Sequence, residues 1–273
     1  MEATTGPART VADELISLHH VPREVPPFTS QRPNLTPDQG YAAMRALHQH
    51  RLDAGWQAVG RKIGFTNTTI WPRYGVYEPI WGWVYDHTLI EAEADRARVP
   101  LAGLVNPRLE PEVCFGLKEA PPASAAADPE RLLAAIDWVA HSVEIVQSYF
   151  PNWSFRLPDC TAVNGLHAQL VVGTRHPVAT IPGLAERLPG VQVVLRHGEQ
   201  VVDRGVGANV LGSPLLALAH LVGVLASQPW AALTAGEVVT TGVITDAHPV
   251  AIGETWSTEI SGMPLAGLIL AFE

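Results

Sequence analysis

The chain has few cysteines and few positive charges, and each shortage excludes a class of protein. Of its 273 residues, two are cysteines, Cys114 and Cys160, which is too few for a disulfide framework and fits a reducing compartment. Lys and Arg number 18 against 27 Asp and Glu, which gives a formal net charge of −9. Because phosphate neutralisation needs clustered basic residues and no such cluster occurs, nucleic acid is disfavoured as a partner.

Long apolar runs are missing too. The longest apolar stretch, residues 215–226, is too short to span a bilayer, and residues 1–14 lack the apolar segment of a signal peptide. We therefore expect a cytoplasmic protein with no membrane partner. Its 47% of hydrophobic and 16% of charged residues allow a sizeable core and argue against global disorder.

What the chain does contain is a pair of glutamates separated by one residue. Glu110 and Glu112 precede an apolar alternation, and residues i and i+2 of a strand point to the same face, so the two carboxylates project together. The opposite face is expected to carry Val113, Phe115 and Leu117. Pro111 between the glutamates indicates an edge strand or a bulge, because proline cannot donate to the ladder.

A third carboxylate, Glu144, interrupts the apolar run 143–146. Burying carboxylates is costly unless a lysine, an arginine or a metal ion neutralises them. Three converging carboxylates without a His or Cys cluster suit a hard divalent cation such as Mg²⁺ or Mn²⁺. A solvated strand face is the alternative for Glu110 and Glu112, but a lone charge in a β-branched apolar run weighs against it for Glu144.

The remaining pattern predicts a helical N-terminal segment, residues 1–57, and a β-rich metal-binding domain, residues 58–273, which form one structural unit. Helices are expected over residues 10–19 and 37–54, the second capped by Thr36 and opened by Pro37, and over 129–139 and 215–227. Strands are expected at 58–65, 80–84, 88–90, 169–172, 191–196, 201–202, 238–244, 255–260 and 265–272. Their Gly and Pro punctuation argues against a regular β–α–β alternation and favours an α+β fold.

In several of these segments the chain resembles the fumarylacetoacetate hydrolase superfamily, and within it the branch of 2-keto-4-pentenoate hydratases and 4-oxalocrotonate decarboxylases. The matching pieces follow the family's order and cover most of the chain. They are residues 60–66, 108–112, 143–148, 159–164, 205–214 with the helix that follows, and 241–242. The resemblance implies a mixed β-sandwich-like roll and a homo-oligomer, with a complex with a related pathway enzyme as an alternative.

The same resemblance implies roles for individual residues. Glu110, Glu112 and Glu144 match the three metal-ligating glutamates, and Lys62 matches the active-site lysine, for which a structural ion pair is the alternative. We expect Mg²⁺ or Mn²⁺ as cofactor and a small 2-oxo or 2-hydroxy-dienoate acid as substrate, processed through a metal-chelated enolate. A hydratase is favoured. The alternatives are a 4-oxalocrotonate-type decarboxylase, an acylpyruvate-type C–C hydrolase and a non-catalytic partner subunit.

Two departures from the family fall in the expected pocket. The hydratases carry a Gln-Pro-Asp or Glu-Pro-Asp triplet where this chain has Glu78-Pro79-Ile80, so Glu78 is expected to replace the missing aspartate, unless it is a solvated loop carboxylate. The hydratases carry small hydroxylated residues where this chain has residues 165–167. His167 is therefore expected to line the pocket as a proton shuttle. The alternative is a buried histidine with a packing role. Hydroxyls for the substrate carboxylate are expected from Thr241 and Thr245, although strand threonines are also common for packing reasons.

Overall fold

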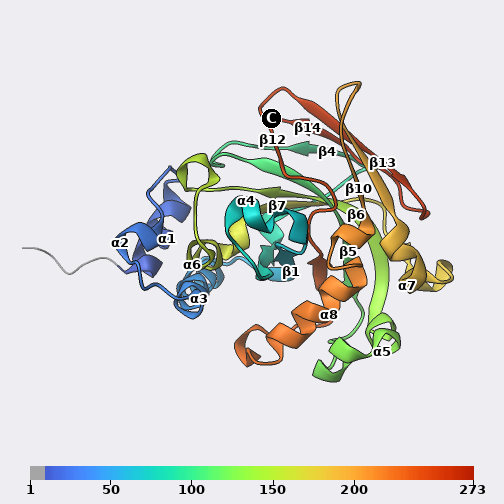
Figure 1. The fold of residues 1–273 in the computed structure, drawn as a ribbon, viewed down its shortest axis with the longest axis horizontal. Helices are drawn as coiled ribbons and strands as arrows, with labels where there is room; N and C mark the ends of the chain where they lie inside the picture. The colour runs from blue at the N-terminus through green and yellow to red at the C-terminus, as the bar shows by residue number, and fades with distance from the viewer. Residues whose placement is uncertain (1–9) are drawn as a thin grey trace, which may run out of the picture.

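The computed structural model describes residues 10–273 of the chain (Figure 1). What the sequence predicts for residues 1–9 lies outside this range. The helices are α1 (Val11–His20), α2 (Phe28–Gln31), α3 (Pro37–Asp53), α4 (Trp71–Tyr74), α5 (Pro129–Ala134), α6 (Leu157–Ala162), α7 (Leu184–Arg187) and α8 (Pro214–Leu225). In this part of the chain, no helix combines the length and the apolar character that a membrane crossing requires.

Within residues 10–273, strands form two mixed sheets of nine and five strands. The larger sheet follows the order β2-β1-β11-β5-β6-β7-β3, with β12 paired to β5 and β8 paired to β6. Its strands are β1 (Ala58–Gly64), β2 (Ile80–Tyr85), β3 (Leu89–Glu91), β5 (Arg108–Leu117), β6 (Ile136–Val146), β7 (His167–Val172), β8 (His176–Pro177), β11 (Val238–Thr240) and β12 (His248–Pro249). The smaller sheet orders β10 (Gln200–Val206), β9 (Gln192–His197), β13 (Thr255–Ser261), β14 (Ile269–Phe272) and β4 (Arg96–Val99). The mixture of helices with two mixed sheets confirms the expected α+β class.

Helix α3 begins after its predicted cap, Thr36, and α1 begins one residue after its predicted start at Thr10. Thr10 caps α1 and Thr36 caps α3, each in a reciprocal capping box with the third helical residue. Helices α1, α2 and α3 lie together at the left of Figure 1, with α6 beside them. The division of the chain at residues 57 and 58 stays a prediction.

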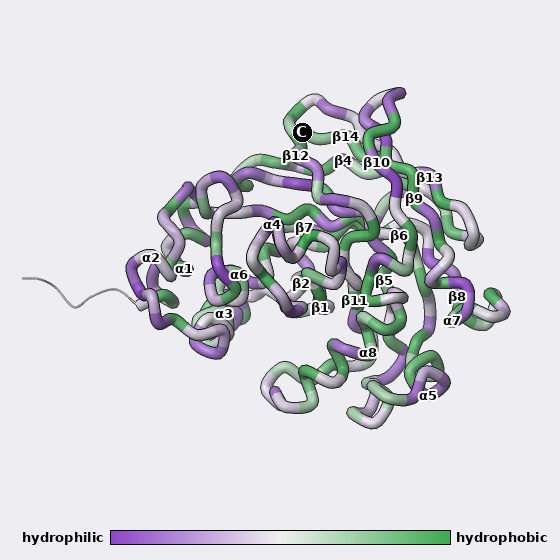
Figure 2. Tube along the Cα trace, viewed as in Figure 1, coloured by the Kyte–Doolittle hydropathy of each residue, from purple (hydrophilic) through white to green (hydrophobic). Residues whose placement is uncertain are grey.

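Strand β5 alternates as its sequence predicts. Val113, Phe115 and Leu117 are buried in the core that also contains the apolar residues of α8, while the glutamates of β5 face the other way. Figure 2 shows α8 as a largely hydrophobic helix, which fits this burial. One face of β5 therefore stabilises the fold through apolar packing and leaves the other face for polar side chains.

Pro111 does not mark an edge strand, and this expectation is wrong. Strand β5 lies between β11 and β6 in the interior of the larger sheet. Proline is tolerated there because β11 ends at Thr240, opposite Cys114, so the missing N–H faces no strand partner on that side. The Pro111 carbonyl accepts a 2.9 Å hydrogen bond from the N–H of Ile244.

The helix expected over residues 129–139 is shorter than predicted. Helix α5 ends at Ala134, and β6 begins at Ile136. Residues 136–139 are extended because they pair with the end of β5, Ile136 with Leu117 and Val139 with Phe115. Cross-strand packing thus overrides the local helical pattern.

Candidate active site and metal centre

Adjacent strands of the larger sheet bring a lysine and three glutamates together. The order β1, β11, β5, β6 places Lys62 beside Thr240, and Glu110 opposite Glu144. Glu112 lies two residues further along β5 and faces the same side as Glu110. Ligand oxygens of the three glutamates lie within 4.8 Å of one another. The convergence expected from the sequence is present.

Glu112 is fully buried and is held through one oxygen. Its Oε2 accepts a short hydrogen bond from the Thr240 hydroxyl and one of 2.8 Å from the backbone N–H of Gly242. Its Oε1 has no hydrogen-bond partner among the described residues. Burial, and then the charges of Glu144 and Glu110, raise the pKa of Glu112 well above its ordinary value. An ionised Glu112 therefore requires further positive charge near Oε1.

Lys62 supplies positive charge inside this cluster. Its Nζ lies 3.3 Å from Glu144 Oε2 and donates a 2.9 Å hydrogen bond to the carbonyl of Gly165. Burial lowers the pKa of Lys62, but the three glutamates outweigh it and hold the pKa above its ordinary value, so the amine stays protonated. A Cβ at Gly64 would lie 2.6 Å from Nζ, so only glycine leaves room for the ammonium there.

The loop of residues 164–166, in which the Gly165 carbonyl accepts the hydrogen bond from Lys62, has an unusual backbone conformation. Asn164, Gly165 and Leu166 all adopt left-handed φ values, of 59°, 62° and 67°. The Asn164 side chain fixes this turn by accepting from the N–H of Trp83 at 2.8 Å and donating to its carbonyl at 2.9 Å. Strain of this kind persists only where surrounding contacts enforce it, and it is common at functional sites.

The remaining two glutamates differ in protonation. Burial raises the pKa of Glu110 to about 7, with Lys62 opposing the shift and Glu144 adding to it. Burial also disfavours the charge of Glu144, but Lys62 and His167 outweigh it and lower the Glu144 pKa. Glu144 is thus the ionised member of the cluster, while Glu110 and Glu112 retain protons more readily.

His167 is not among the residues that line the pocket wall, where it was expected, and its role as a proton shuttle stays a prediction. Its side chain is buried, and both ring nitrogens are occupied: Nδ1 lies 2.8 Å from Glu144 Oε1, and Nε2 lies 3.0 Å from the Thr88 hydroxyl. Burial is the main cause of its lowered pKa, which keeps the ring neutral. A neutral ring donates from Nδ1 to the carboxylate, and Nε2 faces the Thr88 hydroxyl, which also donates to the Tyr85 carbonyl at 3.1 Å. His167 is therefore a positioning residue for Glu144.

Three further expected site residues also lie apart from the pocket wall. Glu78 is exposed, on the segment before β2. The Thr241 hydroxyl donates to the carbonyl of Val113 at 2.7 Å, and the Thr245 hydroxyl donates to that of Asp246 at 2.9 Å. Both hydroxyls satisfy the backbone, so the structure gives them structural rather than substrate-binding contacts.

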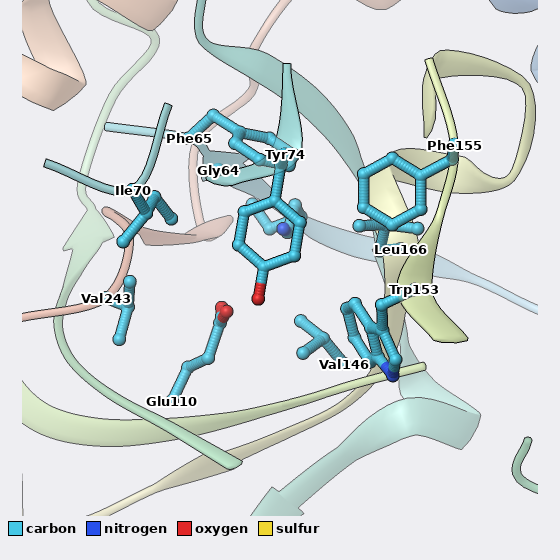
Figure 3. A pocket seen from close by; sticks show the side chains of 11 residues that line it. Gly64, Phe65, Ile70, Tyr74, Glu110, Val146, Trp153, Phe155, Leu166 and Val243 are labelled. Atoms are coloured by element: carbon cyan, nitrogen blue, oxygen red, sulfur yellow. The ribbon is translucent and has the colours of Figure 1, made fainter. Parts of the chain in front are cut away.

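A pocket opens beside the cluster, and Figure 3 shows the side chains around it. Lys62 and Glu110 form its charged end. Its other lining residues are Gly64, Phe65, Ile70, Tyr74, Val146, Trp153, Phe155, Leu166 and Val243. The wall beyond the charged end is therefore mostly apolar and aromatic.

Two contributors to this region, Thr240 and Tyr74, were not predicted from the sequence. Thr240 binds Glu112, and Tyr74 points its hydroxyl into the pocket, toward Glu110 (Figure 3). Arg108 donates to the Tyr74 hydroxyl at 2.8 Å and packs its guanidinium 4.3 Å from the centre of the Trp153 ring. A single aromatic residue between two strands has no distinguishing pattern, so Tyr74 was not detectable by spacing.

The donor set fits a hard divalent cation. The buried Glu112 Oε1 accepts no hydrogen bond from the described residues, and the buried Glu144 Oε2 is paired only with the Lys62 ammonium, at 3.3 Å. They belong to three carboxylates that converge without a soft ligand, and oxygen donors of this kind suit Mg²⁺ and Mn²⁺. A cation there would also offset the repulsion that raises the pKa of Glu112.

Comparison with known proteins supports this assignment at the level of the family. No protein-family model matches the chain. It is 32% identical over 219 residues to a 4-oxalocrotonate decarboxylase of a Pseudomonas species, covering 80% of this chain and 81% of that one. The chain belongs to the 2-keto-4-pentenoate hydratase and 4-oxalocrotonate decarboxylase family. A 2-hydroxyhexa-2,4-dienoate hydratase of Comamonas testosteroni is similar to it as well, with 30% identity over 88% of this chain and 89% of the relative.

Solved structures place the fold in the same family. The 4-oxalocrotonate decarboxylase of Pseudomonas putida G7, complexed with magnesium and adipate, superposes with a TM-score of 0.86 at 26% identity over 96% of both chains. A fumarylpyruvate hydrolase of Pseudomonas aeruginosa, in complex with Mn²⁺ and pyruvate, matches with a TM-score of 0.58 at 12% identity over 78% of this chain and 88% of that one, which shows the fold. The expected fumarylacetoacetate hydrolase fold is confirmed, and the chain is an enzyme of the metal-dependent hydratase and decarboxylase class.

Proposed function

We propose that the enzyme is a hydratase that adds water to a 2-hydroxy-2,4-dienoate acid with an uncharged tail, using Mg²⁺ or Mn²⁺ held by Glu110, Glu112 and Glu144. The observation that carries this proposal is the composition of the pocket. Its only charged lining residues are Lys62 and Glu110, both at the end where the carboxylates converge. A substrate with its carboxylate and 2-oxygen at that end would place its tail among apolar side chains.

Each residue of the charged end has a separate task in this proposal. When bound, the cation supplies Lewis-acid polarisation of the substrate's 2-oxygen. The Lys62 ammonium, held by Glu144 and the Gly165 carbonyl, offers positive charge where negative charge develops on the substrate. His167 keeps Glu144 oriented. The apolar wall keeps bulk water away from the tail.

The test is a substrate comparison with purified protein in Mg²⁺ or Mn²⁺. We expect 2-hydroxypenta-2,4-dienoate to lose its diene absorbance and to yield a 4-hydroxy-2-oxo acid. Glu112→Gln is the matched control, because it keeps the shape of the side chain and removes the charge. Absence of hydration with short-tailed and longer apolar-tailed dienoates alike contradicts the proposal.

A 4-oxalocrotonate-type decarboxylase is the second candidate, and one observation favours it. Arg108 donates to the Tyr74 hydroxyl and packs on Trp153, so a guanidinium able to bind a second carboxylate contacts two residues of the pocket wall. Release of CO₂ from 4-oxalocrotonate, faster than hydration of the dienoate and lost in Arg108→Gln, would favour this reading. The acylpyruvate hydrolase alternative has less support, because neither His167 nor Glu78 lines the pocket. A homo-oligomer and a cytoplasmic location stay predictions.

A further inference from the structure

We propose that Tyr74 is the acid–base residue of the pocket, exchanging protons with the distal carbons of the substrate, and that Arg108 is its positioning residue. This inference rests on the proposed hydratase function and deepens it. Neither His167 nor Glu78 lines the pocket, so another group must exchange protons with the distal carbons.

The Tyr74 ring is firmly placed. Tyr74 is the last residue of α4, which ends at Gly75 in a left-handed conformation with φ 63°. The ring stacks on Phe155, with centroids 5.7 Å apart and an interplanar angle of 7°, and meets the edge of Phe65 at 5.8 Å and 78°. These contacts fix an apolar ring and leave the hydroxyl as its polar tip in the pocket.

Other proton carriers of the pocket wall are already engaged. Trp153 Nε1 donates to the carbonyl of Asn106 at 3.2 Å, and Lys62 Nζ is shared between Glu144 and the Gly165 carbonyl. Glu110 belongs to the proposed cation site. Among the residues that line the pocket, this leaves the hydroxyl of Tyr74 to carry a proton to the tail.

The hydrogen bond that Tyr74 accepts directs its own proton into the pocket. Arg108 Nη1 donates to the hydroxyl oxygen at 2.8 Å, and a guanidinium has no acceptor. The tyrosine proton must therefore point elsewhere, and Figure 3 shows the hydroxyl directed toward the charged end. Arg108 is itself fixed by packing 4.3 Å from the Trp153 ring centre.

The proton transfers balance without an oxidant or a co-reactant other than water. The C2 hydroxyl of the dienoate releases its proton to solvent as the C2 oxo group forms, the C2–C3 electron pair moves to C3–C4, and C5 takes the Tyr74 proton. A water oxygen then bonds to C4 and returns one proton to the Tyr74 phenolate, while C3 takes a proton from solvent. Arg108 stabilises the phenolate between these two transfers. One water is consumed, and the tyrosine returns to its starting state.

The experiment separates chemistry at C3 from chemistry at the distal carbons. Exchange of the C3 protons of 2-oxopentanoate in D₂O, followed by NMR, requires the charged end of the pocket alone. Hydration of 2-hydroxypenta-2,4-dienoate requires Tyr74 as well. We expect Tyr74→Phe to keep C3 exchange and Mn²⁺ affinity at wild-type levels and to lose roughly 10²–10⁴-fold in kcat for hydration. Arg108→Gln should lower the same kcat less, and Arg108→Lys should restore part of it.

Tyr77→Phe is the matched control, since Tyr77 is 64% exposed and close in sequence; it should behave as wild type. Wild-type hydration by Tyr74→Phe overturns the inference and leaves the proposed function standing. A parallel loss of hydration, C3 exchange and Mn²⁺ affinity in Tyr74→Phe also overturns it, because Tyr74 would then support the site structurally. A wild-type enzyme that hydrates no dienoate overturns the proposed function itself.

Discussion

The imidazole of His167 and the carboxylate of Glu144 lie 2.8 Å apart, and the ring's other nitrogen is held by Thr88. The ring is buried and neutral, so it presents an N–H to the carboxylate and fixes the direction of the second oxygen, Oε2, which faces Lys62 Nζ at 3.3 Å. Glu144 is also the glutamate whose pKa is lowered. His167 and Lys62 together therefore keep one carboxylate of the cluster ionised and oriented before any cation binds.

This arrangement predicts a metal defect rather than a proton-transfer defect in His167 variants. Removal of such a support for a ligand typically lowers metal affinity about 10–100-fold. We expect His167→Ala to lose Mn²⁺ affinity in this range, measured by titration calorimetry, and His167→Asn to recover part of it by donating to Glu144. The pH–rate profile at saturating Mn²⁺ should keep both limbs. A flattened limb with unchanged Mn²⁺ affinity would instead make His167 the proton shuttle.

Glu112→Gln should weaken Mn²⁺ binding at least as much as the loss of a residue that only supports a metal ligand. That loss is about 10–100-fold in affinity. It removes a buried charge but keeps a side chain that can still accept from Thr240 and from the N–H of Gly242. The fold should therefore persist, which circular dichroism can check. Equal Mn²⁺ affinity in the variant and the wild type would remove Glu112 from the cation site.

Lys62→Met should abolish turnover while it leaves Mn²⁺ bound. The substitution keeps an unbranched side chain between Gly64 and Gly165 and deletes the charge beside Glu144. A loss of roughly 10²-fold or more in kcat, with Mn²⁺ affinity preserved, fits a role in charge stabilisation. Lys118 is exposed, and Lys118→Met is the matched control. Near-normal kcat in Lys62→Met would reduce this lysine to a structural ion-pair residue.

The metal-free enzyme should lose stability as the pH rises through the range in which Glu110 titrates. The pKa of Glu110 is raised from 4.5 to about 7, mainly by burial, so the folded state favours its protonated form. Its stabilising contribution is complete below pH 4.5 and is lost as the pH approaches 7. In urea unfolding with EDTA, the stability of wild type relative to Glu110→Gln should fall over this window.

Saturating Mg²⁺ provides the control for that measurement. A bound cation favours the ionised carboxylates, so the decline should disappear or reverse when Mg²⁺ replaces EDTA. A difference between wild type and Glu110→Gln that does not change with pH in EDTA would show that Glu110 is not held in its protonated form.

Local patterns in the sequence were enough to predict elements that begin at short-range signals, such as a helix cap. The cap at Thr36 depends on a side chain three residues away, and α3 starts where predicted, while α1 starts one residue later than predicted because Thr10 is its cap. The end of α5 has no such local signal, because it is set by residues from Ile136 onward, which pair with β5. The edge-strand prediction for Pro111 was wrong for a similar reason. Strand β5 is an interior strand because β11, which comes from residues 238–240, pairs with it.

In the candidate site, too, residues with a local pattern were predicted and a residue placed by strand pairing was not. The glutamates were identifiable because Glu110 and Glu112 lie two residues apart on one strand and Glu144 stands in an apolar run. The threonine that reaches Glu112 is Thr240, whereas the sequence indicated Thr241. A shift of one residue reverses the face of a strand, and the register of β11 is fixed only by its pairing with β1 and β5.

The left-handed loop at residues 164–166 allows a last prediction with a closely matched control. Gly165 has φ 62°, and a Cβ there would lie 3.2 Å from Lys62 Cδ and from the Trp81 backbone. Gly198, in the turn between β9 and β10, has φ 56° and open space around the same position. Alanine at either site should cost about 1 kcal/mol or somewhat more of stability, because non-glycine residues disfavour positive φ. Gly165→Ala alone should also lower kcat, since it displaces the lysine that its own carbonyl holds. Thermal unfolding and turnover of the two variants test this, and equal kcat values in both would show that the loop does not position Lys62.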